Sequence, residues 1–407
     1  MNNDDVPLEK HEPDYFEHIE MRYGVELEIC IKFDADCLKT TVEEYGLALE
    51  RTTLLKRFQI YFLYILAKVP IEIREKYPII GFISDKYYIF NLHEPKGVLG
   101  EINYHEATLQ EYMLMLDYEI PIFMEDVTIV CGDHYFSSEQ ERLEYINRNT
   151  EMPIEINKSI GIECISPILK FKGIPEITKI KETLLPFLRL IGLDNNKCFI
   201  TNKSSGYHVN VSAFDTQTNK IIPITKYPLF LFVLQEFILK EKKYYTSSFR
   251  VEPSMWAQPV YALIEKMKGK VANKKNLFNK ISKNGQNIVF PNQTSSLLLN
   301  KDYSIRIKQN RKPDLELIEF RVFRSEKNIE ILMDHALYAL VIVMKGIITA
   351  WFKTNNDGKT NMTNVFRGID FSLQFDGGTR RRKYNRGRLI TSKHRLLGKK
   401  MKNKNKQ

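Results

Sequence analysis

Cysteine is scarce in this sequence, with five in 407 residues and no CxxC pair. No Cys/His cluster has the spacing of zinc ligands, so a zinc finger is not expected. The odd number and wide spacing also argue against a set of structural disulfides; the five are Cys30, Cys37, Cys131, Cys164 and Cys198. The first twenty residues contain no apolar core, which argues against a signal or transit peptide. We therefore expect an intracellular protein, with the cytoplasm as its location.

Long hydrophobic runs are also lacking. The longest candidate covers 17 residues from Ala336 to Phe352 and is interrupted by Lys345. A membrane span usually needs ~20 predominantly apolar residues. The segment is therefore predicted to be a buried helix, and no membrane partner is expected.

Acidic residues are absent from the C-terminal 31 residues, which contain 13 Lys or Arg between Gly377 and Gln407. The other 376 residues hold 47 basic and 50 acidic side chains. The overall charge of +10 therefore describes the tail. Residues 377–407 are predicted to be a disordered basic tail that makes nonspecific contact with nucleic acid.

Apolar material is plentiful in the rest of the chain, at 43% hydrophobic and 12% aromatic residues overall. We expect a flexible acidic N-terminus over residues 1–19 and one folded domain over residues 20–376. Residue periodicity predicts strands at 21–31, 87–92, 123–131, 160–168, 206–211 and 315–323, helices at 45–69, 173–192, 227–239 and 328–352, and a surface loop at 266–287.

Three predicted strands carry two polar groups at positions i and i+2. These pairs are Glu26 with Glu28, His208 with Asn210, and Glu319 with Arg321. A fourth strand carries Glu163 among apolar neighbours. Because side chains alternate between the two faces of a strand, each pair shares one face. Each pair alone is typical of a strand with one face in water.

Together the four strands offer four carboxylates and one imidazole, a ligand set that suits Mg²⁺ or Mn²⁺ better than zinc. The guanidinium of Arg321 can make two parallel hydrogen bonds to phosphate oxygens. We therefore interpret the set as a metal and nucleotide-phosphate site.

The amino-acid sequences of four segments, and the order in which they follow one another, resemble the amidoligase family. Relatives of that family are carboxylate–amine ligases such as glutamine synthetase. The segments are Tyr23–Glu28, Gly161–Leu169, Ser205–Val211 and Ile318–Phe323. The resemblance implies an α+β fold in which a curved antiparallel sheet of glutamine synthetase type has helices packed on its outer face. It also implies ATP and two or three Mg²⁺ ions on the concave side, and small-molecule or peptide acids and amines as substrates.

The resemblance also implies roles for single residues. Glu26 and Glu28 would bind different metals, with Glu163 joining the metal of Glu28. His208 and Glu319 would share the metal of Glu26. Arg321 would bind the transferred phosphoryl group. Asn210 would contact phosphate, at a position where the family more often has a second His. Arg306 would hold a substrate carboxylate or phosphate, unless it is a surface arginine.

Two functions remain open. The first is an ATP- and Mg²⁺-dependent ligase that forms an amide bond through an acyl phosphate. The alternative is a non-catalytic structural or nucleic-acid-associated protein that keeps the ligase scaffold and is tethered by its tail.

Overall fold

A computed structural model describes the chain over residues 14–32, 69–84, 86–95, 102–126, 129, 159–193, 199–201, 205–225, 229–245, 257, 259, 304–308 and 317–354. Our predictions for residues 45–69, 266–287 and 377–407 lie outside these ranges, except for Val69. So do those for most of residues 1–19 and the end of the strand predicted at 123–131.

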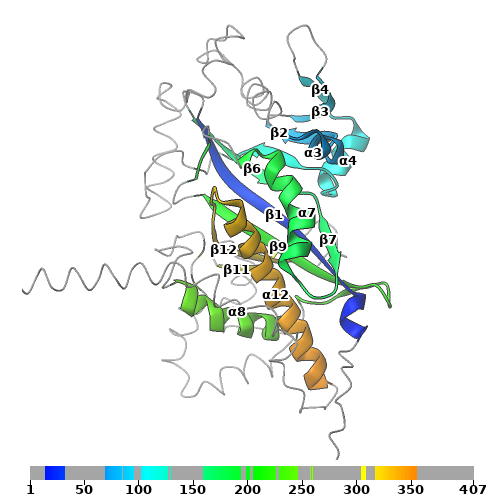
Figure 1. Cartoon of the computed structure of the whole chain (residues 1–407), viewed down its shortest axis with the longest axis vertical. Helices are drawn as coiled ribbons and strands as arrows, with labels where there is room; N and C mark the ends of the chain where they lie inside the picture. Colours follow the sequence, from blue (N-terminus) through cyan, green and yellow to red (C-terminus); the bar gives the residue numbers. More distant parts are fainter. Residues whose placement is uncertain are drawn as a thin grey trace, which may run out of the picture.

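The described chain alternates strands and helices (Figure 1). The strands are β1 (Ile19–Lys32), β2 (Ile79–Ile83), β3 (Tyr87–Pro95), β4 (Ile102–Glu106), β5 (Ile122–Glu125), β6 (Ser159–Ile165), β7 (Leu169–Lys172), β8 (Phe199–Ile200), β9 (Gly206–Asp215), β10 (Lys220–Ile222), β11 (Ile305–Lys308) and β12 (Leu317–Arg324). The helices are a 3₁₀ turn (Asp14–His18), α3 (Ile71–Lys76), α4 (Leu109–Leu116), α7 (Ile177–Leu190), α8 (Leu229–Tyr245) and α12 (Ile329–Thr354).

The strands form one large mixed sheet in the order β11-β12-β9-β1-β6-β5-β2-β3-β4, with β10 beside β9 and both β7 and β8 beside β1. The α+β class is therefore as predicted, but the sheet is not antiparallel throughout, because β2 and β5 run parallel. This parallel pair is possible because β3, β4 and α4 lie between the two strands in sequence and return the chain. The sequence between β2 and β5 contained no pattern that predicts how these two strands pair.

One face of β1 forms the floor of the main core. Val25, Leu27 and Ile29 are fully buried on this face. Tyr23 shares it and forms a 2.6 Å hydrogen bond from its hydroxyl to that of Thr183 on α7. Burying each such apolar side chain contributes roughly 1.5–3 kcal/mol. Because strand side chains alternate, Glu26 and Glu28 project from the opposite face.

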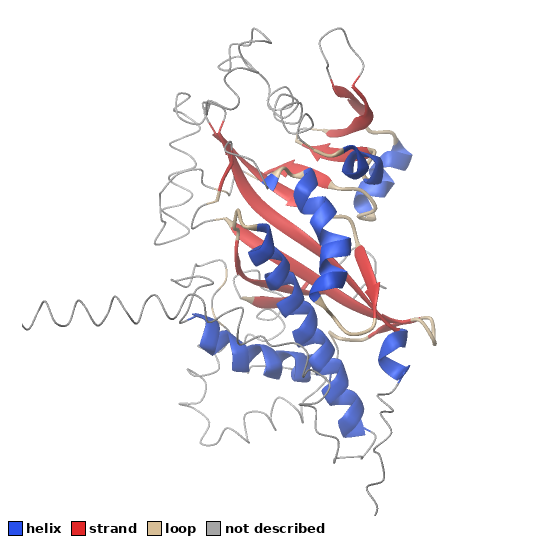
Figure 2. Ribbon diagram, in the orientation of Figure 1, coloured by secondary structure: helices blue, strands red, loops and turns tan. Residues whose placement is uncertain are grey.

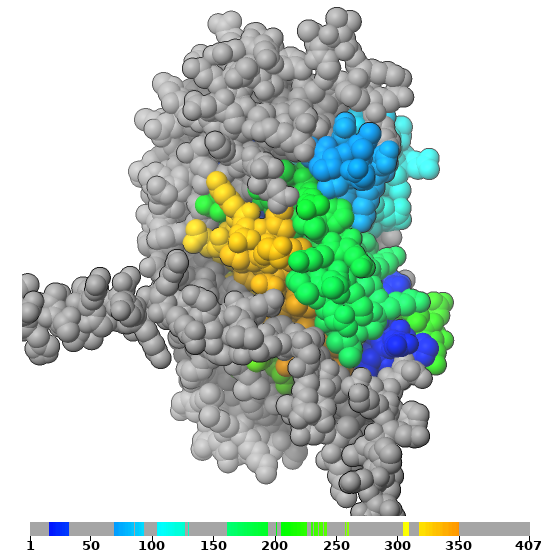
Figure 3. Space-filling view, in the orientation of Figure 1, coloured from blue at the N-terminus to red at the C-terminus, as the bar shows by residue number. Residues whose placement is uncertain are grey.

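Helices α7 and α12 cover the apolar face (Figure 2). The space-filling view shows the atoms of α7 between those of α3 and α12 on this side (Figure 3). Phe323 at the end of β12 stacks on His335 of α12 with ring centroids 4.7 Å apart. The apolar face of the sheet is therefore closed by helices, as expected for an outer face.

Helix α12 confirms the buried helix predicted at the end of the domain. Its segment Ile329–Thr349 is long and apolar enough to cross a membrane, but 83% of its most apolar window is buried inside the fold. Gly346 permits close packing, since a Cβ there would lie 2.4 Å from Val233 Cγ2 on α8. The hydrophobicity of α12 is therefore used in core packing.

Helix α4 lies on the other face, which corrects the prediction that the helices pack on the outer face of the sheet. Its Met115 packs with Ile89 of β3 and Ile122 of β5. Side chains alternate between the two faces along each strand, and these two isoleucines lie on the face opposite the main core. A Cβ at Gly81 would lie 2.7 Å from Met115 Cε, so α4 sits directly on β2. Among the described elements, α4 thus covers the glutamate-bearing face at its β2–β5 end.

Several boundaries differ from the predicted ones. The strand predicted at 160–168 is two strands, because Pro167 has no backbone N–H to donate between β6 and β7. Helix α7 begins at Ile177 rather than at residue 173, and Gly192 follows its end with φ 79°. Glycine adopts this left-handed conformation without strain and commonly ends helices. At the N-terminus, Asp14–His18 already belongs to the fold as a 3₁₀ turn.

Cysteine usage also departs from the prediction. Cys30 on β1 is disulfide-bonded, whereas Cys164 on β6 is a buried free thiol. Burial raises the pKa of the Cys164 thiol well above its ordinary value, so it is an inert core residue.

Candidate metal and phosphate site

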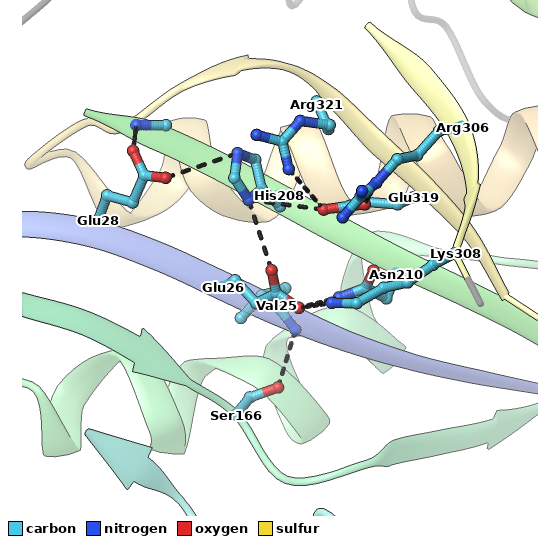
Figure 4. A network of polar contacts seen from close by, with 11 residues as sticks. Val25, Glu26, Glu28, Ser166, His208, Asn210, Arg306, Lys308, Glu319 and Arg321 are labelled. Atoms are coloured by element: carbon cyan, nitrogen blue, oxygen red, sulfur yellow. Dashed lines mark hydrogen bonds and ion pairs between the residues drawn. The ribbon is translucent and has the colours of Figure 1, made fainter. Parts of the chain in front are cut away.

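Strand register brings the predicted residues of four strands onto one face. Glu26 of β1 pairs with His208 of β9, and Asn210 of β9 pairs with Glu319 of β12. On the other side of β1, Glu28 pairs with Glu163 of β6. A bulge in β12 between Phe320 and Phe323 changes the register just after this point. Residues spread over nearly three hundred positions of sequence therefore line one surface (Figure 4).

The closest group on this surface consists of Glu26, His208 and Glu319. One ligand atom from each lies within 4.8 Å of the others, and all three residues are buried. His208 Nδ1 is 3.4 Å from Glu26 Oε2 and 3.7 Å from Glu319 Oε1. This nitrogen is buried and has no hydrogen-bond partner among the described residues. A buried nitrogen without a partner, facing two carboxylate oxygens, is the arrangement that a divalent cation would satisfy.

Lys308 of β11 neutralises Glu26. Its Nζ donates a hydrogen bond to Glu26 Oε1, and the Nδ2 of Asn210 donates to the same oxygen at 2.7 Å. Burial alone would raise the pKa of Glu26, but the Lys308 ammonium and the contact with His208 hold it well below its ordinary value. Burial would lower the pKa of Lys308, and the carboxylates of Glu26 and Glu319 raise it instead. Both groups are therefore charged at neutral pH.

Two arginines neutralise Glu319. Arg321 Nη1 lies 2.9 Å from Glu319 Oε1, and Arg306 Nε donates to Oε2. Burial and Glu26 raise the pKa of Glu319, whereas His208, Lys308 and Arg321 lower it, and the net shift is downward. Arg306 is thus not a surface arginine, because its neighbour in β12 is Glu319 itself.

Glu28 and Glu163 occupy the β6 side of the triad. Glu28 accepts a hydrogen bond from the backbone N–H of Gly206, and its Oε1 is 3.8 Å from His208 Nε2. Burial and the nearby carboxylates of Glu26 and Glu28 raise the pKa of Glu163 well above its ordinary value. These two glutamates do not form a three-ligand group with any other residue in the described parts of the chain. A second metal at Glu28 and Glu163 stays a prediction.

Lys308 and Ser166 belong to this surface and were missed in the sequence. Ser166 Oγ accepts the backbone N–H of Val25 at 2.9 Å and donates to the carbonyl of Pro167, so it fixes the strand next to Glu26. The signal for Lys308 was present: Arg306 and Lys308 are separated by two in a short strand, the same spacing as Glu26 and Glu28.

The surface therefore combines four carboxylates, one imidazole and three cations: Glu26, Glu28, Glu163, Glu319, His208, Lys308, Arg306 and Arg321. No protein-family model matches the chain, and no curated protein matches it either. The resemblance to amidoligases consequently rests on the four sequence segments alone.

Proposed function

We propose that the protein is an ATP- and Mg²⁺-dependent carboxylate–amine ligase of glutamine synthetase-like fold. The observation that supports this proposal best is the buried triad of Glu26, His208 and Glu319, in which the His208 Nδ1 has no hydrogen-bond partner in the described part of the chain. Arg321 lies directly beside it, 2.9 Å from Glu319. A cation site next to an arginine is the combination that binding a triphosphate requires.

The residues present fit a divalent cation. Two carboxylates whose pKa values are lowered by neighbouring cations and one imidazole nitrogen can supply three ligands, and Mg²⁺ or Mn²⁺ accepts such oxygen-rich sets. Bound there, the ion would neutralise charge that develops on phosphate oxygens. Lys308, Arg306 and Arg321 hold the same carboxylates by hydrogen bonds or ion pairs. They would have to share these oxygens with the ion or release them.

The reaction needs no side-chain nucleophile. A carboxylate oxygen of the acid attacks the γ-phosphorus of ATP, the bond to the bridging β-oxygen breaks, and ADP leaves with the electron pair. The amine nitrogen then attacks the acyl carbon, the carbon–oxygen bond to phosphate breaks, and phosphate leaves while the nitrogen loses its proton. In this scheme Arg321 and Arg306 would bind the phosphoryl oxygens, because both guanidinium groups face the triad.

A thermal-shift experiment tests the proposal. ATP should raise the melting temperature when Mg²⁺ is present and not when EDTA removes it, because ligand binding stabilises the folded state by mass action. Glu26→Gln should abolish the shift, and Glu106→Gln, which changes an exposed carboxylate paired with Lys86, should keep it. Equal shifts with and without EDTA, or none at saturating Mg·ATP, would contradict the ligase function.

One observation favours the alternative of a non-catalytic scaffold. Three cations already pair with Glu26 and Glu319, so the charge cluster is partly balanced by the protein itself. On this alternative the polar surface would hold the strands in register, and any nucleic-acid contact would come from residues 377–407. Absence of any metal-dependent ATP shift would favour it.

We also propose that the protein works in the cytoplasm. The burial of α12 fits a soluble protein in any compartment, whereas the disulfide at Cys30 opposes a cytoplasmic location, because cytosolic proteins seldom keep disulfides. Unfolding the protein without reductant in excess alkylating reagent tests the point, because the buried Cys30 can react only once the fold is lost. Full reactivity of Cys30 would support the cytoplasm, and a protected Cys30 would contradict it.

A further inference from the structure

Helix α4, at the β4 end of the sheet, has one uncovered apolar side (Figure 1). Leu109 and Met113 are four residues apart and so share a side of the helix, where they are 78% and 47% exposed. Met115, which packs onto β2, projects from the other side. Tyr87 of β3 is 40% exposed and extends the uncovered side, because its ring lies 4.6 Å from that of Tyr112 on α4. We call Tyr87, Leu109, Tyr112 and Met113 the α4 surface.

The α4 surface is a concentration of exposed apolar groups. Six large apolar side chains are exposed among the described residues, and three of them, Tyr87, Leu109 and Met113, belong to this surface. Single exposed apolar side chains are ordinary, whereas a contiguous group of them is typical of an interaction surface.

Acidic residues surround the α4 surface. Residues 102–126 contain six Asp or Glu and no Lys or Arg. Glu106 precedes α4 and Glu119 follows it, and both are exposed. Lys86 of β3 balances one of these charges, since its Nζ lies 2.7 Å from Glu106 Oε2. A partner that matches this surface would therefore be both apolar and basic.

The C-terminal segment of the chain has this composition. Residues 377–407 contain 13 Lys or Arg and no acidic residue. Two apolar pairs, Leu389 with Ile390 and Leu396 with Leu397, are seven residues apart. Because seven residues make about two helical turns, a helix would place both pairs on one side. This is the pattern by which amphipathic helices bind apolar surfaces.

We propose that the α4 surface binds residues 377–407 of the same chain. The apolar pairs contact Leu109 and Met113, and the basic side chains lie against the acidic residues around α4. Attraction between opposite charges favours this arrangement, and burial of the apolar side chains fixes its position. The proposal uses no residue of the triad and does not depend on the ligase function.

The connection to α12 is long enough for binding within one molecule. The 22 residues of 355–376, which follow α12, can span roughly 70 Å when fully extended. A folded domain of about 350 residues has a radius of gyration of roughly 20 Å, so a tether of this length can reach any side of it. Tethering also raises the local concentration of the segment, which favours its own chain over a second copy.

Carbodiimide cross-linking of the full chain tests the proposal, because this reagent joins lysine amines directly to carboxylates. A mixture of isotopically light and heavy protein distinguishes links within one molecule from links between two. Lysines of residues 377–407 should join to Glu106, Glu111, Asp117 or Glu119, with both linked peptides light or both heavy. Absence of these links, or mixed links as frequent as unmixed ones, would overturn the proposal.

Variants separate specific binding from attraction by charge alone. Leu109→Ser combined with Met113→Ser keeps every acidic residue and should weaken binding about tenfold or more, because it removes the apolar contact. The cross-link yield should fall, and trypsin should cleave residues 377–407 faster. Leu396→Ser combined with Leu397→Ser should have the same effect from the other partner.

Ile71→Ser combined with Ile331→Ser is the matched control, since both isoleucines are exposed, on α3 and α12. This variant should keep the yield and the cleavage rate of the unmodified chain. Equal yields and cleavage rates in all three double variants would overturn the proposal, because the contact would then not involve the α4 surface.

Discussion

Glu26 on β1 and His208 on β9 are cross-strand partners, and the Glu26 Oε2 lies 3.4 Å from the His208 Nδ1. The nitrogen makes no hydrogen bond to this or any other group among the described residues. The pair thus leaves a strong ligand atom close to two carboxylates, at 3.4 and 3.7 Å, without a hydrogen bond to either. The predictions below follow from this arrangement and from the fold that supports it.

His208→Ala should weaken Mn²⁺ binding by at least tenfold, because it removes the only nitrogen ligand of the triad. Electron paramagnetic resonance of free Mn²⁺ during titration measures the affinity. His105→Ala is the matched control, since His105 is exposed and contacts Glu111 away from the site. If both variants bind Mn²⁺ like the unmodified chain, His208 is not a ligand.

Lys308→Met should have opposite effects on metal affinity and on metal-free stability. Removal of the ammonium leaves Glu26 without its cation, so the melting temperature should fall when no metal is present. Mn²⁺ should bind more tightly, because it no longer competes with Lys308 for the same carboxylate. Weaker Mn²⁺ binding in this variant would show that Lys308 does not compete with the ion.

Acidification should destabilise the protein through His335. Burial on α12 lowers the pKa of this histidine from its ordinary value to about 3. The unfolded chain therefore takes up a proton below about pH 6.5 that the folded chain refuses, and stability falls as the pH decreases toward 3. At pH 5 the loss should be about 2 kcal/mol relative to pH 7 and above.

Urea unfolding of the unmodified protein and of His335→Leu at pH 7 and pH 5 measures this contribution. The leucine variant should lose about 2 kcal/mol less between the two pH values, whatever its stability at pH 7. An identical pH dependence in both proteins would mean that His335 does not titrate on unfolding.

Gly346→Ala should destabilise the fold by about 1–3 kcal/mol, although alanine favours helices more than glycine. A Cβ would lie 2.9 Å from the backbone nitrogen of Val233, so α8 and α12 would have to separate. Gly24→Ala is the matched control, because the added Cβ would lie 3.6 Å from Ser166 Oγ, which is an ordinary van der Waals contact. Thermal unfolding compares the two, and equal melting temperatures would contradict the close helix packing.

The i and i+2 spacing made the faces of β1, β9 and β12 predictable. Glu26, His208 and Glu319 could therefore be assigned to polar faces from the sequence, and the order of the segments grouped them. Arg306 remained ambiguous because its strand has only four residues, so its alternation of apolar and basic side chains is too short to stand out from the surrounding sequence. Lys308 was missed for the same reason.

Other features depend on long-range packing that local patterns do not encode. The parallel pairing of β2 with β5 and the position of α4 follow from contacts between residues such as Gly81 and Met115. The hydrogen bond of Asn210 to Glu26 could not be predicted either, because strand spacing shows which face a side chain shares but not its partner on the neighbouring strand.

A crystal soaked with Mn²⁺ and a non-hydrolysable ATP analogue tests the central claim most directly. Our account predicts anomalous density for manganese bound by Glu26, His208 and Glu319, with the γ-phosphate beside Arg321. Lys308 or the arginines should then have given up part of their contact with the carboxylates. Manganese at other residues only, or a triad still fully paired with its three cations at saturating Mn²⁺ and nucleotide, would contradict the account.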